Sequence, residues 1–170
     1  MKPDEQVMTL RIILFILLAV ALGACGFQLR GSNLETLKHS RVYIKSGGAD
    51  ELALQIKKQL EFADVAVAQD PNQADYVIEL GHESFKRSIL NVSAQTGKVE
   101  EYEITYNASF SVKGPNGTVL LKNEAVTAQR DYTFDKNSVL GKFDEEKKLR
   151  EEITQYAADS VLRRVQAVTH

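Results

Sequence analysis

Residues 102–113 read YEITYNASFSVK, and this run decides the fold of the chain. Apolar and polar residues alternate along it without a break, which is the period of a β-strand. Strict alternation predicts a long strand with one face buried and the other facing water or a partner. The apolar positions are Tyr102, Ile104, Tyr106, Ala108, Phe110 and Val112.

Turn signals on both sides extend this strand into a sheet. Gly114-Pro115-Asn116-Gly117 follows it, and Asn116-Gly117 supplies the positive φ angles of a tight hairpin. Residues 118–134 form the expected return strand, where a slip in the alternation near Asn123 predicts a bulge. Upstream, the turn at 95–98 connects back to a strand-like run over 76–92, in which Gly81 marks a second expected bulge.

Two segments have helical spacing. Residues 50–63 place apolar residues three and four apart, with Gln, Lys and Glu on the other side. From Asp144 onward, apolar residues recur every four positions and predict a long C-terminal helix. Short β-branched runs at 41–45 and 65–67 read as two further strands, and residues 135–142 as a loop. The order predicts an α+β fold with two helices on one face of a small mixed sheet.

The N-terminus has the layout of a bacterial export signal. A largely apolar run, Leu10 to Ala24, has the basic residues Arg11 at its start and Lys2 upstream, and it ends directly before the only cysteine of the chain. Leu22-Gly23-Ala24-Cys25 matches a lipobox, so we expect residues 1–24 to be a signal peptide. Cys25 would then carry a diacylglyceryl group and an N-acyl chain such as palmitate, the only covalent additions expected. A transmembrane anchor is the alternative, but the run is short for one and no cationic cluster follows it.

The sequence leaves two translation starts open, Met1 and Met8, because a chain that began at Met8 would also have the pattern of a signal peptide. After residues 1–24, the organisation predicted is a lipidated tether over 25–40 and a single α/β domain over 41–170. The formal charge of −2 excludes the basic surface expected of a nucleic-acid-binding protein. With its single cysteine acylated the domain would hold no disulfide, so its stability must come from packing.

The sequence predicts no enzyme: we assign no catalytic residue, metal site or cofactor. Its histidines are dispersed at positions 39, 82 and 170. His82 and Glu83 are neighbours in a strand, so their side chains point to opposite faces and do not form a pair. No His/Cys cluster has the spacing of metal ligands. A lipid-anchored periplasmic hydrolase, the least favoured alternative, would need a clustered Ser/His/carboxylate pocket.

Cations gather in sequence around two expected loop tips, at 95–98 and 137–142. Such cations could bind the phosphates of an anionic lipid head group, or could be an ordinary solvated scatter of charge; composition alone leaves both open. They are Lys86, Arg87, Lys98, Lys142, Lys147 and Lys148.

Three stretches carry a resemblance to a known family. They are CGFQLRG at 25–31, EYEI at 101–104 leading into YNA at 106–108, and QRDYTFD at 129–135 before an acidic last helix. Their order and spacing resemble the LptE family, lipopolysaccharide-assembly lipoproteins of Gram-negative bacteria. The resemblance implies two helices packed on one face of a four-stranded, mostly antiparallel mixed sheet.

The resemblance also implies a partner and a place. The domain would plug an LptD-like outer-membrane β-barrel, help to assemble it, and assist lipopolysaccharide insertion at the cell surface. Its lipopolysaccharide contacts would be Lys142 in the loop before the last helix and Lys98, the cation nearest to Gln95 at the hairpin tip; Arg87 is a third candidate. Gly26 after the lipidated cysteine implies outer-membrane localisation, facing the periplasm. The alternative is an auxiliary lipoprotein of another lipid-trafficking transporter.

Overall fold

The computed structural model describes residues 34–133 and 142–169, with side chains from 146 onward in the second range. Contacts divide the chain into Met1–Gly31 and Ser32–His170, and all described residues belong to the second unit. The predicted signal peptide, Cys25 and most of the predicted tether therefore lie outside the described residues. The same holds for the predicted loop up to residue 141.

Strand β5 (Val99–Lys113) is the centre of the sheet, and it contains the alternating run. It pairs antiparallel with β6 (Val119–Thr133) along one side. Its other side is shared between β4 (Ser84–Val92), over the first part of β5, and β3 (Tyr76–Leu80), over the last part. Two parallel strands follow beyond β3: β1 (Arg41–Lys45) and then β2 (Ala66–Val67).

The sheet thus has six strands, in three antiparallel and two parallel pairings, and the expected four-stranded, mostly antiparallel sheet is wrong. The sequence pattern itself contained five strand-like runs, and the sixth strand comes from a break at Gly81, where a bulge was expected. The Gly81 N–H donates to the Ser109 carbonyl at 2.7 Å, and a Cβ on Gly81 would lie 2.3 Å from the Ser109 Oγ. A residue with a Cβ would have to displace the Ser109 side chain, so glycine suits this close approach; β3 ends at Leu80 and the chain resumes pairing as β4 at Ser84.

The bulge predicted in the return strand is confirmed. Lys122 and Asn123 stand between the cross-strand pairs Phe110–Glu124 and Val112–Leu121, opposite the single residue Ser111. Asn123 has φ 50°, and its N–H donates to the Ser111 Oγ at 2.9 Å. The hairpin turn is also as predicted, with positive φ at Asn116 and Gly117 inside η3 (Pro115–Gly117).

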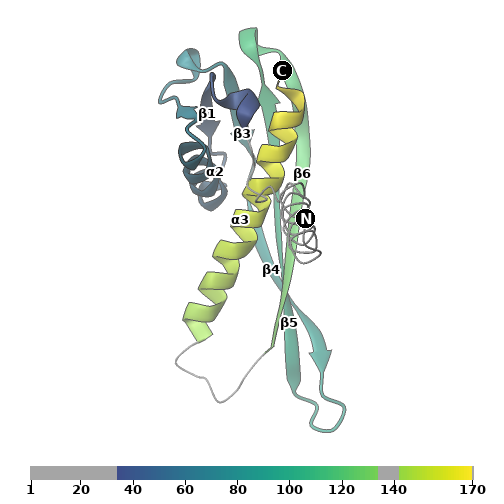
Figure 1. Ribbon diagram of the computed structural model, residues 1–170. Helices are drawn as coiled ribbons and strands as arrows, with labels where there is room; N and C mark the ends of the chain where they lie inside the picture. The colour runs from purple at the N-terminus through teal and green to yellow at the C-terminus, as the bar shows by residue number, and fades with distance from the viewer. Residues whose placement is uncertain (1–33, 134–141, 170) are drawn as a thin grey trace, which may run out of the picture. The chain divides into compact units, whose positions relative to one another are not determined.

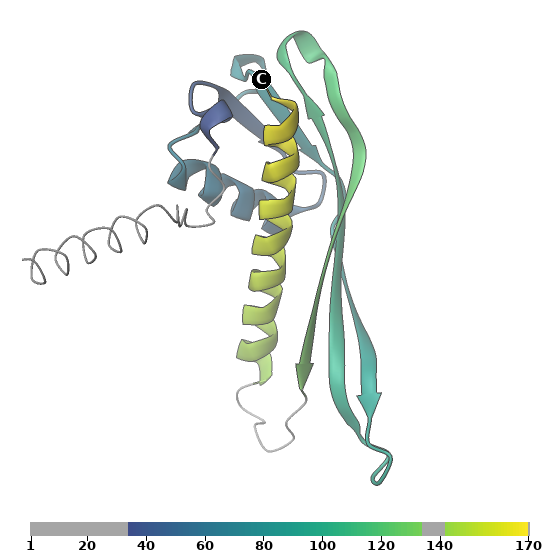
Figure 2. The ribbon, with the colours of Figure 1, turned by 45° about the vertical axis from the view of Figure 1, so that its right-hand side comes forward.

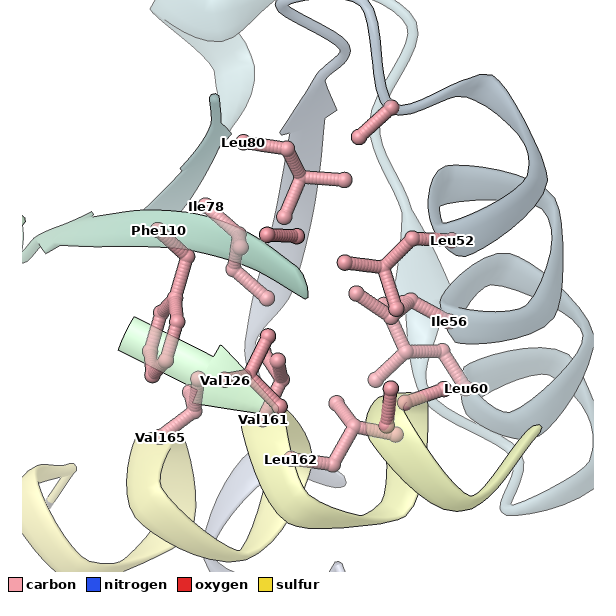
Figure 3. Packing of buried hydrophobic residues seen from close by; sticks show 14 of the residues in the cluster. Leu52, Ile56, Leu60, Ile78, Leu80, Phe110, Val126, Val161, Leu162 and Val165 are labelled. Atoms are coloured by element: carbon pink, nitrogen blue, oxygen red, sulfur yellow. The ribbon is translucent and has the colours of Figure 1, made fainter. Parts of the chain in front are cut away.

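Both helices lie on the same side of the sheet (Figure 2), as predicted. Helix α2 is Asp50–Phe62 and helix α3 is Lys142–Val168, while η1 (Glu35–Leu37) and η2 (Pro71–Gln73) are short 3₁₀ turns. The alternate residues of β5 from Ile104 to Val112 are buried beneath the helices. Figure 3 shows how residues of α2, α3, β3, β5 and β6 meet in one apolar cluster; its labelled members are Leu52, Ile56, Leu60, Ile78, Leu80, Phe110, Val126, Val161, Leu162 and Val165.

Helix α3 runs past this core toward the end of the sheet where β4 and β5 form their hairpin (Figure 1). Its buried residues extend from Ile153 to Val165, so its first turns reach beyond the apolar cluster. Within the described part of the chain, no helix combines the length and apolarity needed to cross a bilayer.

Candidate functional site

The predicted lipid-contact residues all belong to the half of the domain that holds the β4–β5 hairpin and the start of α3. Arg87 lies within β4, Lys98 directly precedes β5, and Lys142 is the first residue of α3. The side chain of Lys142 is outside the described residues, as is all of Cys25.

Lys98 sits on an ordered turn. The Ser93 N–H donates to the Lys98 carbonyl at 2.8 Å, and the Gly97 N–H donates to the Ser93 carbonyl at 2.8 Å. Gly97 has φ 66°, a conformation that favours glycine. The Lys98 side chain is exposed, and no acidic side chain in the described ranges pairs with it. A fully hydrated cation at a hairpin tip is therefore available to a ligand.

Arg87 has partners from three elements on the helix-facing side of the sheet. Its guanidinium lies 5.1 Å from the centre of the Tyr102 ring on β5, and its Nη1 is 3.7 Å from the Glu146 Oε2 on α3. A hydrogen bond to the Tyr132 hydroxyl on β6, together with the Glu146 carboxylate, raises the pKa of Arg87. Arg87 therefore stays cationic at any physiological pH.

Glu146 joins Arg87 to a second arginine. Arg150, one turn further along α3, donates to the Glu146 Oε1 from Nη2 at 2.9 Å and from Nε at 3.2 Å. The Arg150 guanidinium lies 4.8 Å from the centre of the Phe85 ring on β4. We call Arg87, Arg150, Glu146, Phe85 and Tyr102 the arginine cluster. It is a cation–π and ion-pair arrangement that connects the start of α3 to the β4–β5 hairpin.

The structure does not bring Lys98 and Arg87 together. Arg87 pairs across the strands with Ile104, six residues along β5 from Lys98. At about 3.3 Å per residue this is a separation of roughly 20 Å. The predicted cations thus form two positions on the hairpin, one at its tip and one beside α3.

Between these two positions β4 exposes large apolar side chains. Ile89 is 59% exposed, Leu90 50% and Val92 47%. Ile89 is on the same face of β4 as Arg87, two residues nearer the tip, and pairs with Tyr102. These exposed residues were not among the predicted site residues, although consecutive Ile89 and Leu90 in a strand with one solvated face were a usable signal. Arg150 and Glu146 were not predicted either, because their only local signal is a spacing of four residues in a helix.

The arrangement that a hydrolase would need is not found in the described part of the chain. His82 is exposed, and the carboxylate of its neighbour Glu83 accepts hydrogen bonds from two other residues. The buried Tyr106 hydroxyl donates to the Glu83 Oε2 at 2.8 Å, and the Glu51 N–H in the first turn of α2 donates to its Oε1 at 3.0 Å. Glu83 is therefore a structural acceptor that joins β5 to the start of α2. No group of three His, Cys, Asp or Glu residues among those described is placed to hold a metal ion.

The face of the sheet away from the helices is polar. The Thr127 hydroxyl of β6 donates to the Asn107 Oδ1 of β5 at 3.0 Å, and the Thr105 hydroxyl donates to the Glu103 Oε1 at 3.1 Å. Neither described helix covers this face, which is the one predicted to meet water or a partner.

Solved structures with the same fold exist. The chain has a TM-score of 0.63 and 28% identity to rare lipoprotein B from Shewanella oneidensis, with 75% of this chain and 94% of that one covered. Uncharacterized lipoprotein B from Nitrosomonas europaea gives 0.66 and 23%, with coverage of 84% and 91%. A minor lipoprotein from Acinetobacter baumannii gives 0.60 and 23%, with coverage of 75% and 90%. The last two show the likeness of fold alone.

No curated protein sequence matches the chain. The model of the LptE family, described as lipopolysaccharide-assembly, matches residues 40–165, which span β1 to the last turns of α3. The predicted family is therefore confirmed: the chain belongs to the LptE family and has a role in lipopolysaccharide assembly.

Proposed function

We propose that this chain is an outer-membrane lipoprotein that plugs an LptD-like β-barrel, helps to assemble it, and assists lipopolysaccharide insertion at the cell surface. The observation that carries the proposal is the family match, because it extends over nearly the whole described domain. The domain would act by binding its partners, without making or breaking covalent bonds.

The proposed anchor is the lipid on Cys25, with the domain facing the periplasm. Several acyl chains, at about 0.8 kcal/mol per buried methylene, give durable attachment, whereas a single chain gives only reversible binding. The solved structures that share the fold are named as lipoproteins, which supports this anchor. An anchor at the N-terminal end would leave the domain free to enter the lumen of a barrel.

The polar face of the sheet suits the inside of a barrel. The lumen wall of an outer-membrane barrel is polar, because its strands alternate apolar side chains toward lipid with polar ones toward the interior. Hydroxyl and amide groups such as those of Thr127 and Asn107 can donate and accept across such a wall. The same face also carries charged side chains, among them Glu103, Asp131 and Lys86, so the barrel wall would have to offer them charged, hydrogen-bonding or hydrated partners.

The proposed lipopolysaccharide contacts are Lys98, Arg87 and Lys142. Lys98 supports this role through its exposure at the hairpin tip, and Arg87 through its exposure beside apolar residues. Both would bind the phosphate groups of the ligand, which form strong charge-assisted hydrogen bonds with ammonium and guanidinium groups.

Co-purification tests the barrel partnership. The tagged full-length lipoprotein is extracted from membranes in a mild detergent and its partners are identified. We expect a large outer-membrane barrel protein in stoichiometric amount; recovery of the lipoprotein as a free monomer would contradict the proposal. Depletion of the protein separates the auxiliary-transporter alternative, because loss of surface lipopolysaccharide is expected only from the proposed function.

A further inference from the structure

We propose that Arg87 and Arg150 form a binding site for the phosphate group of a lipid amphiphile, and that the Glu146 carboxylate is the internal ligand which that phosphate displaces. The site lies between β4 and the start of α3. It is separate from Lys98 at the hairpin tip, and two of its three charged residues had no function assigned by the sequence.

The geometry of Glu146 shows that one anion reaches both arginines. Its Oε1 accepts from Arg150 at 2.9 and 3.2 Å, while its Oε2 lies 3.7 Å from the Arg87 Nη1. A phosphate group also presents several oxygens from one centre, and guanidinium groups bind phosphate through paired N–H donors. A phosphate in the position of the carboxylate could therefore bridge the same two guanidiniums.

The aromatic rings hold both guanidiniums in place. Arg87 lies over Tyr102 at 5.1 Å and Arg150 over Phe85 at 4.8 Å, each measured to the ring centre. These rings come from β5 and β4, so their positions are fixed by the sheet. Arginines that are already oriented lose less side-chain entropy when they bind an anion, which favours binding.

The exchange of Glu146 for phosphate is favourable because the existing ion pairs are weak. The side chains of Arg87, Arg150 and Glu146 are 55%, 41% and 29% exposed, so solvent screens their attraction. A phosphate carries more charge than a carboxylate and offers more acceptor oxygens. Displaced Glu146 would remain hydrated at the surface of α3, and no buried charge would be left unpaired.

The exposed apolar side chain of Ile89 indicates that the phosphate belongs to a lipid. Ile89 follows Arg87 on the same face of β4, about 7 Å away along the strand. Of the exposed apolar residues of β4, Ile89 is the one that shares the face of Arg87, and it is 59% exposed. An acyl chain lying on Ile89 would cover it while the head-group phosphate binds the arginines, whereas free phosphate would leave it in water.

The inference rests on the proposed function in one respect only, namely the identity of the amphiphile that the protein meets in the cell. Its test needs the purified lipoprotein alone, in dodecyl maltoside micelles. Loss of barrel co-purification would leave the result of this test unchanged, and failure of this test would leave the barrel partnership unchanged. The two proposals can therefore fail separately.

The experiment is an NMR titration of the arginine Nε–H resonances of the full-length protein. The probes are dihexanoyl phosphatidic acid, which carries a phosphate monoester, its phosphatidylcholine counterpart, and inorganic phosphate. We expect phosphatidic acid to shift the resonances of both Arg87 and Arg150 with one common saturation curve. E146Q removes the competing carboxylate and should tighten binding roughly fivefold, whereas R87Q or R150Q should weaken it roughly tenfold.

R163Q is the matched control, because Arg163 is exposed on the same helix and has no ion pair within the described residues. It should bind like wild type. Unchanged binding in R87Q and R150Q, or no gain in E146Q, would overturn the site. Inorganic phosphate binding as tightly as phosphatidic acid would overturn the lipid assignment, as would equal binding of phosphatidylcholine. Loss of the apolar contribution in I89N, seen as weaker binding of phosphatidic acid with inorganic phosphate unaffected, would support it.

Discussion

The Tyr106 hydroxyl offers a sharp test of how the two halves of the domain are joined. Tyr106 is fully buried in β5, and it donates to Glu83, which in turn accepts the Glu51 N–H at the start of α2. The residue before α2, Ala49, supplies no side-chain cap. Glu83 therefore acts as a cap provided by a distant part of the chain, and Tyr106 holds it in position.

Replacement of Tyr106 by phenylalanine keeps the ring and removes this hydrogen bond. A hydrogen bond to a charged acceptor contributes about 1.5–3 kcal/mol. Because Glu83 is only half-buried, water can replace part of this, so we expect a loss of about 1–2 kcal/mol in the free energy of unfolding. For a domain of this size that is a fall in Tm of roughly 4–8 °C.

The same group predicts a pH dependence. Burial, followed by the hydrogen bond to Glu83 and the charges of Glu83 and Glu51, raises the pKa of Tyr106 above its ordinary value. Above about pH 10 the unfolded chain ionises this tyrosine while the folded chain keeps it protonated. The unfolded state then binds fewer protons, so the free energy of unfolding falls as pH rises. The stabilisation is complete below that pH and is lost above it, and Y106F should lose this alkaline slope.

Urea unfolding of the full-length protein in micelles, followed by far-UV circular dichroism between pH 7 and pH 11, measures both effects. Tyr43→Phe is the control, because Tyr43 is half-buried and no hydrogen bond of its hydroxyl is found in the described part of the chain. A Y106F variant that matched wild type at pH 7 and kept the full alkaline slope would refute this role of the Tyr106 hydroxyl.

The remaining predictions concern the core, the break between strands and the anchor. Phe110→Asp buries a charge at a position only 1% exposed and should abolish cooperative unfolding, whereas Ala125→Asp on the open face should melt within about 2 °C of wild type, as calorimetry would show. Gly81→Ala should lower the free energy of unfolding by about 1–3 kcal/mol, because the new Cβ meets the Ser109 Oγ. Ser109→Ala in the same chain should restore most of this loss in a double-mutant cycle, and no restoration would show that the strain lies elsewhere. Cys25→Ser should remove radiolabelled palmitate from the protein in cells, and retained label would contradict the proposed anchor.

Much of the fold could be predicted because the relevant signals are local. The alternation from Tyr102 to Val112 needs only one buried face, and the Asn116–Gly117 turn needs only positive φ. The break at Gly81 could not be predicted in this way, because it depends on Ser109, which is far along the chain and adjacent only after β3 has paired with β5. A glycine in a strand signals a bulge and a close approach equally well.

The candidate site was predictable only in part, for the same reason. Arg87 was visible as a cation near a loop tip. Its ion-pair partner Glu146, however, lies in α3, which is separated from β4 in the sequence by both β5 and β6. The spacing of Glu146 and Arg150 indicates a helical pair, and nothing local indicates that a third residue shares it. Sequence signals thus identified Arg87 alone among the charged residues of the arginine cluster, while tertiary packing decided which residues act with it.

The shared side of β5 has a consequence for the order in which the chain can fold. β3 pairs with residues 110–113 and skips β4, so β3, on which the parallel strands β1 and β2 are built, has no antiparallel neighbour until the far end of β5 has been synthesised. A ribosome or export channel delivers the chain from its N-terminal end, and the first half would therefore lack the support of β5 while it emerges. Such a delay would keep the polypeptide able to pass through an export channel. The complete native sheet would form only after most of the domain has been delivered.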